Sequence, residues 1–450
     1  MATKKDLIEA QTFSRRRLLT AFTGGAPGGR ELEPAKPLVA VIAGIALSIM
    51  LVLGGVFIGM IRPGLPSGWE HGHLIIASDT GSRYLAIDGV LHPVVNTASA
   101  RLLVPSGEFE VITTDQATLA GIEVGRSIGI VGAPDELPAR AALVDDAWAA
   151  CLAEDGSSVM ALSSLPVAAA TPEHGITVAL DEQVFIVAGA RRHVVAGAQT
   201  SAVLRAAGLG SLAPRDVEGR WLELFAEGDP LEPIVVAGAG TEVPGTALRV
   251  GEAVHPTGSP DDDRYLVTAE GELAPLSPLA YQLYLLGTGA EFGAAREVGP
   301  GELATLTTAT TPAGGADWPR DVLTEFTTGD SPCAVLDTSG EAPTTRIGLA
   351  KRELPEVGAA GGVAMQRGAG AVVAAGGSGS ARAETVFVID ETGTAFPVPG
   401  ADPDVLHRLG YDDDDVTAVT NAWIDWFPTG PALTPEAAAH TAEPASASGG

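Results

Sequence analysis

The longest apolar stretch of the chain runs from Leu38 to Ile61 and contains neither a charged residue nor a proline. At about 1.5 Å per residue a helix over this stretch is about 36 Å long, enough to cross a hydrocarbon layer of about 30 Å with some tilt. A helix is expected because backbone amides in lipid must be paired within their own segment. The pattern therefore predicts one transmembrane helix over residues 38–61.

Two export signals are the alternatives to an uncleaved anchor. A cleaved secretory signal has an apolar region of about 7 to 15 residues, whereas this stretch is longer and continues into Arg62 and Pro63. The sequence SRRRLL from Ser14 to Leu19 resembles a twin-arginine signal, but a polar segment rich in Gly and Pro separates it from the apolar stretch. An uncleaved anchor fits the sequence best.

Beyond the anchor, short apolar runs alternate with Gly and Pro, which is typical of strands and turns. One motif recurs here: an apolar run, a glycine, and a proline four residues later. It begins at Tyr84, Tyr265 and Val386, and a fourth copy at Val184 has His193 in the proline position. Each copy predicts a short hairpin whose turn uses the permissive glycine. The glycines and prolines of the motif are Gly89, Pro93, Gly189, Gly271, Pro275, Gly393 and Pro397.

A helical segment follows each predicted hairpin. These segments begin near Asn96, Gln199, Ser277 and Asp402, and the last three end on glycine, as capped helices do. A unit of this size cannot bury a core of its own. We therefore expect four small ββα-like repeat modules that flank a central β domain, and the fold class is predicted to be α+β and rich in β structure.

These features predict how the chain is divided. The segments are a cytoplasmic N-terminal segment (1–37), a transmembrane helix (38–61), a stem (62–73), repeat modules 1 to 4 (74–126, 181–212, 264–300 and 384–427), three parts of the central domain (127–180, 213–263 and 301–383) and a disordered tail (428–450). The tail is predicted to be disordered because it has no aromatic residue and, apart from threonine, no β-branched one.

Charge predicts the orientation of the anchor. Residues 1–37 carry seven basic and four acidic side chains, so the N-terminus is expected in the cytoplasm and the large domain outside it, in a single-pass membrane protein. The basic cluster Arg15, Arg16 and Arg17 is expected to contact anionic lipid or a cytoplasmic partner. The formal net charge of the chain is −29, so the outer domain is strongly acidic and does not attract nucleic acid.

The chain has two cysteines, Cys151 and Cys333, and both lie beyond the anchor. Because the compartment there is oxidising, one disulfide between them is expected. Two cysteines so far apart are a poor zinc site, since zinc prefers four ligands. The sequence therefore predicts neither a metal nor another cofactor.

In their order and coverage these features resemble the EccB subunit of type VII (ESX) secretion machines. KKDLIEAQTFSRRRLLTAFTGGAPGG resembles the family's amphipathic cytoplasmic segment, YLAIDGVLHPVVNTASARLL resembles its first repeat, and SIGIVGAPDELP followed by Trp148 and Cys151 resembles the segment with its first disulfide cysteine. The resemblance covers nearly the whole chain except the tail. It implies a structural subunit that builds the export pore with EccC, EccD, EccE and the mycosin protease, and that is oligomeric in the assembled complex.

Motifs for catalysis are weak. No G-x-x-x-x-G-K-[ST] loop occurs, the best phosphate-loop candidate is the glycine-rich stretch from Gly368, and Lys351 is the only lysine beyond the anchor. G-x-S-x-G is absent, and the acidic runs 261–263 and 412–415 lack the spacing of a calcium loop. We therefore predict that the protein is not an enzyme. The alternatives are a membrane-anchored cell-wall-binding module and an extracytoplasmic ATPase or other hydrolase.

Overall fold

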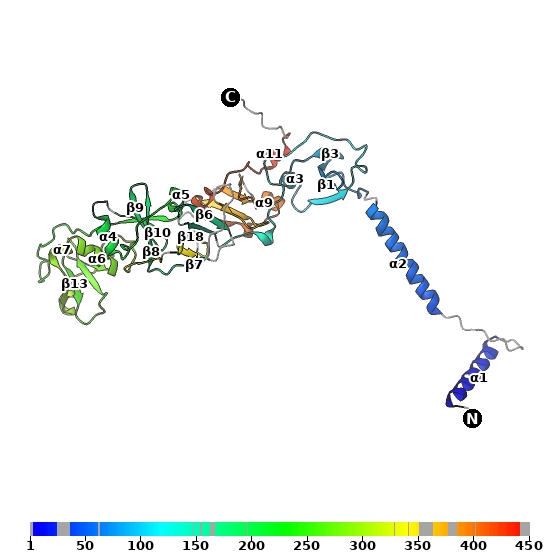
Figure 1. Ribbon diagram of the computed structural model, residues 1–450, viewed down its shortest axis with the longest axis horizontal. Coiled ribbons are helices and arrows are strands. Elements are labelled where there is room, and N and C mark those ends of the chain that lie inside the picture. The colour runs from blue at the N-terminus through cyan, green and yellow to red at the C-terminus, as the bar shows by residue number, and fades with distance from the viewer. Residues whose placement is uncertain are drawn as a thin grey trace.

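The fold is mixed α/β and rich in β structure, with several small sheets preceded by two helices (Figure 1). The computed structural model describes residues 3–24, 37–61, 64–146, 148–153, 155–162, 167–195, 197–327, 329–340, 342–350, 363–376, 385–400 and 402–441.

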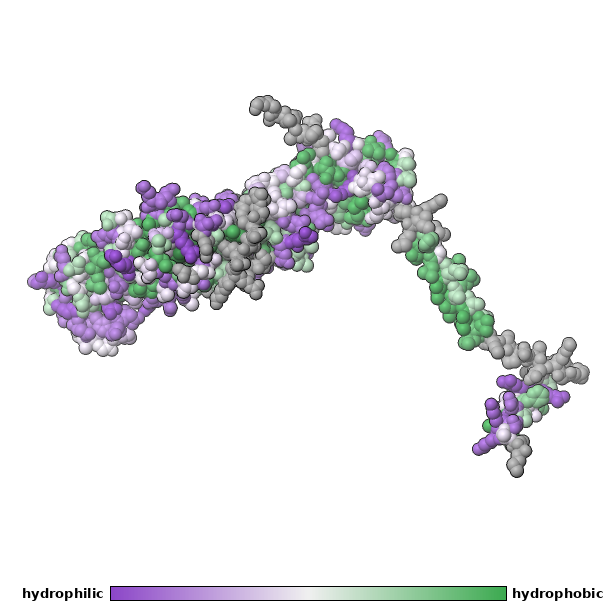
Figure 2. Space-filling model, in the orientation of Figure 1, coloured by the Kyte–Doolittle hydropathy of each residue, from purple (hydrophilic) through white to green (hydrophobic). Residues whose placement is uncertain are grey.

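The two N-terminal helices are α1 (Lys4–Gly24) and α2 (Pro37–Ile61). Within α2 the span Leu38–Phe57 is long and apolar enough to cross a membrane, and among the described residues no other helix meets that test. Its side chains form a continuous hydrophobic surface (Figure 2). This is the helix that the hydrophobic pattern predicts.

Among the described residues there are five sheets, of which four are named the first to fourth in chain order and the remaining one is the central sheet; three of the five have four strands and one shared strand order. In each, three consecutive strands pair antiparallel, a helix follows, and a last strand returns parallel to the first. The first sheet contains β1 (His73–Ala77), β2 (Ser82–Ile87), β3 (Val90–Pro93), α3 (Thr97–Leu103) and β4 (Glu110–Thr114). The third contains β13 (Ala253–Pro256), β14 (Arg264–Val267), β15 (Leu273–Leu276), α6 (Pro278–Leu286) and β16 (Arg296–Val298). The fourth contains β21 (Ala371–Gly376), β22 (Thr385–Ile389), β23 (Ala395–Val398), α9 (Pro403–Leu409) and β24 (Thr417–Thr420).

The second sheet is an extended version of the same arrangement. Its strands are β8 (His174–Leu180), β9 (Gln183–Ala188) and β10 (Arg191–Val195), followed by α4 (Thr200–Ala206). Two short strands, β11 (Arg215–Asp216) and β17 (Thr324–Glu325), pair parallel with β8. A further strand, β12 (Ala226–Leu231), pairs parallel with β10. In the other three sheets, within the described part of the chain, the third strand has no partner equivalent to β12 and forms a single parallel bridge instead. These bridges join Leu91 to Val124, Leu273 to Thr308 and Ala395 to Thr429.

The remaining sheet is central in the molecule. Its strands, in spatial order, are β20 (Val363–Ala364), β6 (Ser158–Leu162), β5 (Trp148–Leu152), β18 (Ser331–Asp337), β19 (Thr344–Ala350) and β7 (Val167–Ala169). Every residue of β5 is buried, as its uninterrupted apolar sequence requires. The ring of Trp148 packs edge-on against Trp423, with centroids 6.2 Å apart, and against Phe427 at 5.7 Å.

Two pairs of sheets lie on opposite sides of the central sheet (Figure 1). The third sheet is at the far end, next to the second, and the fourth and first lie on the side of α2. Helices α4 and α6 pack together through a cluster that includes Val203 and Leu283, and α3 packs against α9 through one that includes Leu102 and Leu409. The short elements are α5 (Gly219–Leu222), α7 (Gly289–Phe292), α8 (Pro300–Leu303), α10 (Asn421–Ile424), α11 (Pro435–Ala439), η1 (Arg140–Ala142), η2 (Gly197–Gln199) and η3 (Asp413–Asp415).

The sheets are larger than the hairpin-and-helix units that the sequence predicts. Strands β8, β13 and β21 begin upstream of the predicted modules, and a parallel strand follows each helix. Segment 213–263, predicted as part of the central domain, instead supplies β11 and β12 to the second sheet and β13 to the third. A hairpin is marked locally by its turn glycine, whereas a parallel strand pairs across a long connection and has no such local mark.

Much of the predicted stem is folded onto the first sheet. Leu65 and Trp69 pack against a buried cluster on one face of that sheet. The Gly72 amide donates to the Ala86 carbonyl at 2.9 Å, and the Gly89 amide donates to the Glu70 carbonyl at 3.0 Å. The chain between residues 65 and 72 is therefore a packed part of the first sheet rather than a separate linker.

The prediction of a disordered tail is wrong for residues 428–441, and residues 442–450 lie outside the described part of the chain. Leu433 is fully buried among side chains that include Leu102 and Leu409, and its amide donates to the Pro397 carbonyl at 2.8 Å. The Gly129 amide donates to the His440 carbonyl at 3.2 Å. Composition misleads here because the apolar surface that buries the segment comes from the first and fourth sheets.

We predict that Leu433→Ala destabilises the protein by about 2 to 5 kcal/mol, because the substitution leaves a cavity between α3, α9 and α11. Denaturant unfolding of the variant and the parent protein measures the change. Glu436→Ala on the exposed side of α11 is the matched control and should stay within about 0.5 kcal/mol of the parent. Equal stability of the Leu433 variant and the parent would show that this segment contributes no packing.

Candidate interaction sites

The predicted disulfide is present in the central sheet. Cys151 on β5 and Cys333 on β18 occupy opposite positions of neighbouring antiparallel strands, and their sulfur atoms are bonded at 2.03 Å. Both residues are fully buried. The bond connects strands 182 positions apart in the sequence, so it fixes the pairing of the two halves of the central sheet.

We predict that Cys333→Ser clearly lowers the unfolding temperature of the protein. In the chain-entropy model, closing a loop of this length stabilises a fold by about 5 kcal/mol, an upper figure because denatured chains are already compact. The double change Cys151→Ser with Cys333→Ser should cost little more than the single one, since both remove the same bond. Thermal unfolding of oxidised protein tests this, and free thiols in protein isolated from membranes would refute the pairing.

The four glycines of the sequence motif lie in the turns between the second and third strands of their sheets. All have a positive φ: 81° at Gly89, 56° at Gly189, 81° at Gly271 and 74° at Gly393. Asp88 also has a positive φ of 51°, so Asp88 and Gly89 form a two-residue turn of the kind that matches strand twist. The left-handed backbone explains why glycine recurs there.

The prolines of the motif lie on the third strands, opposite an aromatic residue. Pro93 pairs with Tyr84, Pro275 with Tyr265 and Pro397 with Phe387. In the second sheet the residue opposite the aromatic Phe185 is Val194 rather than His193.

The assignment of His193 to the proline position is therefore wrong by one residue. Gly189 is the first residue of its turn, which lies between Ala188 and Arg191, whereas Gly89 is the second residue of its own. Counting four positions from the glycine consequently slips by one. By strand register His193 corresponds to His92 of the first sheet.

The structure reveals a recurring contact that the sequence analysis missed. The rings of His92, His193 and Phe396, each on a third strand, lie over a glycine in the chain that follows the helix. A Cβ atom at that glycine would come within 2.5 Å of the ring at Gly125, 2.4 Å at Gly228 and 2.4 Å at Gly430. In the third sheet the ring is replaced by Ala274, and Ala309 stands in the glycine position. The sequence signals this contact only through the sizes of two distant residues: a ring on the third strand occurs with a glycine after the helix, and an alanine occurs with an alanine.

We predict that Gly228→Ala destabilises the protein by about 1 to 3 kcal/mol, because the new methyl group displaces the buried His193 ring. Gly301→Ala is the control, since no atom lies within 4 Å of a Cβ at that position and its backbone is not left-handed. This control should be neutral or slightly stabilising. Denaturant unfolding distinguishes the two, and equal stability of both variants would contradict the close packing.

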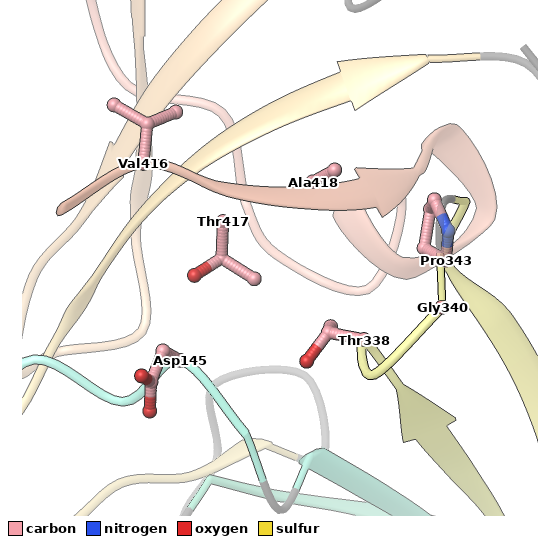
Figure 3. Close-up of a pocket in the computed structure, with 7 residues that line it drawn as sticks. All are labelled: Asp145, Thr338, Gly340, Pro343, Val416, Thr417 and Ala418. Carbon is pink, nitrogen blue, oxygen red and sulfur yellow. The ribbon is translucent and has the colours of Figure 1, made fainter. Parts of the chain in front are cut away.

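A pocket of about 260 Å³ lies at the edge of the fourth sheet, between β24 and the turn that joins β18 to β19. Thr417 points from β24 toward Thr338 and Asp145 (Figure 3). The lining has one carboxylate and no basic residue, so it does not suit a phosphate group.

The glycine-rich stretch from Gly368 does not form a phosphate loop in its described part. The amide of Gly368 donates to a carboxylate oxygen of Glu391 at 2.7 Å, and the following residues form the buried strand β21. Residues 377–384 and Lys351 lie outside the described part of the chain. Residues 368–376, the described part of this stretch, contain no lysine, and the Gly368 amide is already bonded, so these residues do not form a loop that holds a nucleotide phosphate.

The acidic runs serve local structure. Asp412 and Asp415 form a capping box around η3, and both pair with Arg140. These ion pairs, led by the hydrogen bond to Asp415, raise the pKa of Arg140 above its usual value. Asp262 lies 3.5 Å from Arg320. Among the described residues no group of three His, Cys, Asp or Glu side chains is placed to hold a metal ion.

The basic cluster Arg15, Arg16 and Arg17 lies on α1, and all three side chains are exposed. The same helix exposes large apolar residues, which are Leu7, Ile8, Phe13, Leu18, Leu19 and Phe22. The helix therefore presents both charge and apolar area.

A β-rich body that follows an apolar helix of membrane-spanning length and contains a buried disulfide is the architecture of a membrane-anchored protein. Comparison with known families identifies the group to which it belongs. The family model "Type VII secretion system ESX-1, transport TM domain B" matches residues 1–446. The chain therefore belongs to the EccB family of type VII secretion systems.

Curated relatives carry ATPase in their names. The chain is 25% identical over 440 residues to the ESX-3 secretion system ATPase EccB3 of Mycolicibacterium smegmatis, covering 88% of this chain and 82% of that protein. It is 30% identical over 165 residues to the ESX-5 secretion system ATPase EccB5 of Mycobacterium marinum, covering 36% and 30%.

Solved structures share the fold. A chain of the intact ESX-5 inner membrane complex superposes with a TM-score of 0.68 at 18% identity, covering 100% of this chain and 98% of that one. A chain of the EccB3 dimer from the ESX-3 core complex superposes with a TM-score of 0.66 at 24% identity, covering 82% and 99%.

Proposed function

We propose that the protein is a structural core subunit of a type VII secretion membrane complex, which it anchors and scaffolds on the extracytoplasmic side of the export channel. Membership of the EccB family, over residues 1–446, is the observation that carries this proposal. The row of sheets adds support, because each sheet packs on the next from the docked stem to the far end. A row of sheets packed on one another can hold partner proteins at a fixed separation.

The four related sheets are best explained as four repeat modules that flank a central domain. The shared strand order and the glycine turns recur in all four, and a ring over a glycine recurs in three of them, in positions that correspond by register. Helix packing then joins module 1 to module 4 and module 2 to module 3. Each module alone has too little core to be stable, so the pairs should fold as units.

The partners of the proposed complex follow from the family resemblance: EccC, EccD, EccE and the mycosin protease. One solved relative is an EccB3 dimer and another belongs to an inner membrane complex, which supports an oligomeric state for this chain as well. Helix α1 is the segment proposed to engage the cytoplasmic side, because its Arg15, Arg16 and Arg17 are exposed. Anionic lipid and a protein partner could each be bound through this charge.

The experiment that tests the scaffold proposal is gentle detergent extraction followed by native gel sizing. The parent protein should migrate in a very large complex that contains other secretion subunits. Changing Arg15, Arg16 and Arg17 to Gln should reduce the assembled fraction more than the matched change of Lys4 and Lys5 to Gln, if the cluster docks specifically. Migration of the parent protein as a free monomer or dimer would overturn the proposal.

We propose that α2 spans the membrane with the N-terminus in the cytoplasm. Seven basic and four acidic side chains in residues 1–37, against a strongly acidic remainder, support this orientation. A reporter enzyme fused after Gly450 should be active only outside the cytoplasm, and protease added to spheroplasts should remove most of the chain. Full protection of the protein in intact spheroplasts would contradict this orientation.

We also propose that the protein does not hydrolyse nucleotides, although its relatives are named ATPases. The occupied amide of Gly368 and the buried strand after it support this view. The purified full-length chain should show no saturable nucleotide turnover. Turnover that one substitution abolishes without unfolding the protein would prove the proposal wrong while leaving the scaffold role intact.

A further inference from the structure

A second pocket, of about 280 Å³, lies beside the turn between β9 and β10. One wall belongs to the second sheet and the other to the chain that returns from the third sheet. Its lining residues are Pro172, Ala188, Gly189, Ala190, Arg191, His193, Asp317, Pro319 and Arg320. The lining thus contains two arginines and one carboxylate, in a chain whose acidic residues outnumber its lysines and arginines by 56 to 27.

Hydrogen bonds between backbone and side chains hold the two walls together. The Asp229 amide donates to Asp317 Oδ1 at 2.9 Å, and the Ala316 amide donates to Asp229 Oδ2 at 3.0 Å. Trp318 Nε1 donates to the Pro230 carbonyl at 3.0 Å. The pocket is therefore formed before any ligand enters, which lowers the entropic cost of binding.

The two arginines differ in how firmly they are held. Arg191 Nη1 donates to the Glu227 carbonyl at 2.6 Å and lies 3.3 Å from Asp317 Oδ2, so its position is fixed. The side chain of Arg320 is 73% exposed and reaches Asp262 only at 3.5 Å. Arg320 is consequently the charge that can turn toward a ligand.

His193 also lines this pocket, and its ring is almost fully buried. Its Nδ1 lies 2.8 Å from the Asp229 carbonyl oxygen, which can only accept, so Nδ1 carries the proton. Burial, only partly offset by that hydrogen bond, lowers the pKa of the imidazole, which favours the neutral ring. Nε2 of the neutral ring then has a lone pair to accept a hydrogen bond.

We propose that this pocket binds a small carboxylate-bearing ligand, with Arg320 and Arg191 donating to the carboxylate and His193 Nε2 accepting from a neighbouring hydroxyl or amide. Its volume is just below the range of about 300 to 1,000 Å³ that is typical of small-molecule sites. One sugar or one terminal amino acid fits that size. The binding activity is separate from the scaffold role and does not depend on it.

The carboxylate can come from an acidic sugar or from the end of a peptide, and two pairs of probes distinguish these sources. Glucuronic acid is compared with glucose, and N-acetylalanine with N-acetylalaninamide. Binding to the full-length protein in detergent micelles is measured by saturation-transfer NMR and calorimetry. In at least one pair the acid should bind about ten-fold or more tightly than its neutral partner, as expected for a charge-assisted hydrogen bond. Equal binding within both pairs, or none, overturns the proposal.

Variants locate the site. Arg320→Gln should weaken binding of the acid about ten-fold, since it removes an exposed charge and little packing. His193→Phe should also weaken binding, and Phe396 over Gly430 shows that a phenyl ring is compatible with the same position in a related sheet. Arg346→Gln is the control, because Arg346 is similarly exposed and pairs with Asp337 elsewhere. If neither pocket variant binds more weakly than this control, the proposed site is wrong.

Discussion

Burial of the strand β5 is the interaction on which the rest of the structure depends. On this strand Trp148 packs against Trp423 and Phe427, which follow the last strand of the fourth sheet. Trp221 is on α5, which comes between β11 and β12 of the second sheet in the sequence. Its indole nitrogen donates a hydrogen bond to the carbonyl of Ala150 at 2.8 Å. Trp148 and Ala150 thus connect the central sheet to both of its neighbours. Disulfide bonding of Cys151 secures the same strand to β18.

The outer sheets use helices for their own junctions. Helices α4 and α6 pack on one side of the centre, and α3, α9 and α11 pack on the other. A single four-stranded sheet with one short helix has little core of its own. Pairing two such sheets through their helices buries apolar surface of both, and β5 lies between the two pairs.

Local signals in the sequence were sufficient to predict some of this architecture. The turn glycines could be read because a left-handed backbone is imposed at one residue, and the N-cap side chains of Asn96, Ser277 and Asp402 each accept a hydrogen bond at a helix start. The apolar helix and the disulfide were predictable from length, count and compartment.

The features that were missed depend on residues distant in the chain. Strand pairing decides whether Gly189 is the first or the second residue of its turn. Because it is the first, the position equivalent to the motif proline is Val194 rather than His193. The returning parallel strands can be as short as the two residues of β11. The pocket beside the β9–β10 turn joins Arg191 to Arg320, whose approach follows only from the folded connection between sheets.

The stem after α2 is docked on the body through the first sheet. Leu65 and Trp69 are packed on the first sheet only a few residues after α2 ends, and the Glu70 carbonyl accepts from the amide of the turn glycine Gly89. The first sheet is in turn joined to the fourth by the buried Leu433 and by α3. The stem is therefore connected through packed junctions to β5, and from there to the far sheets.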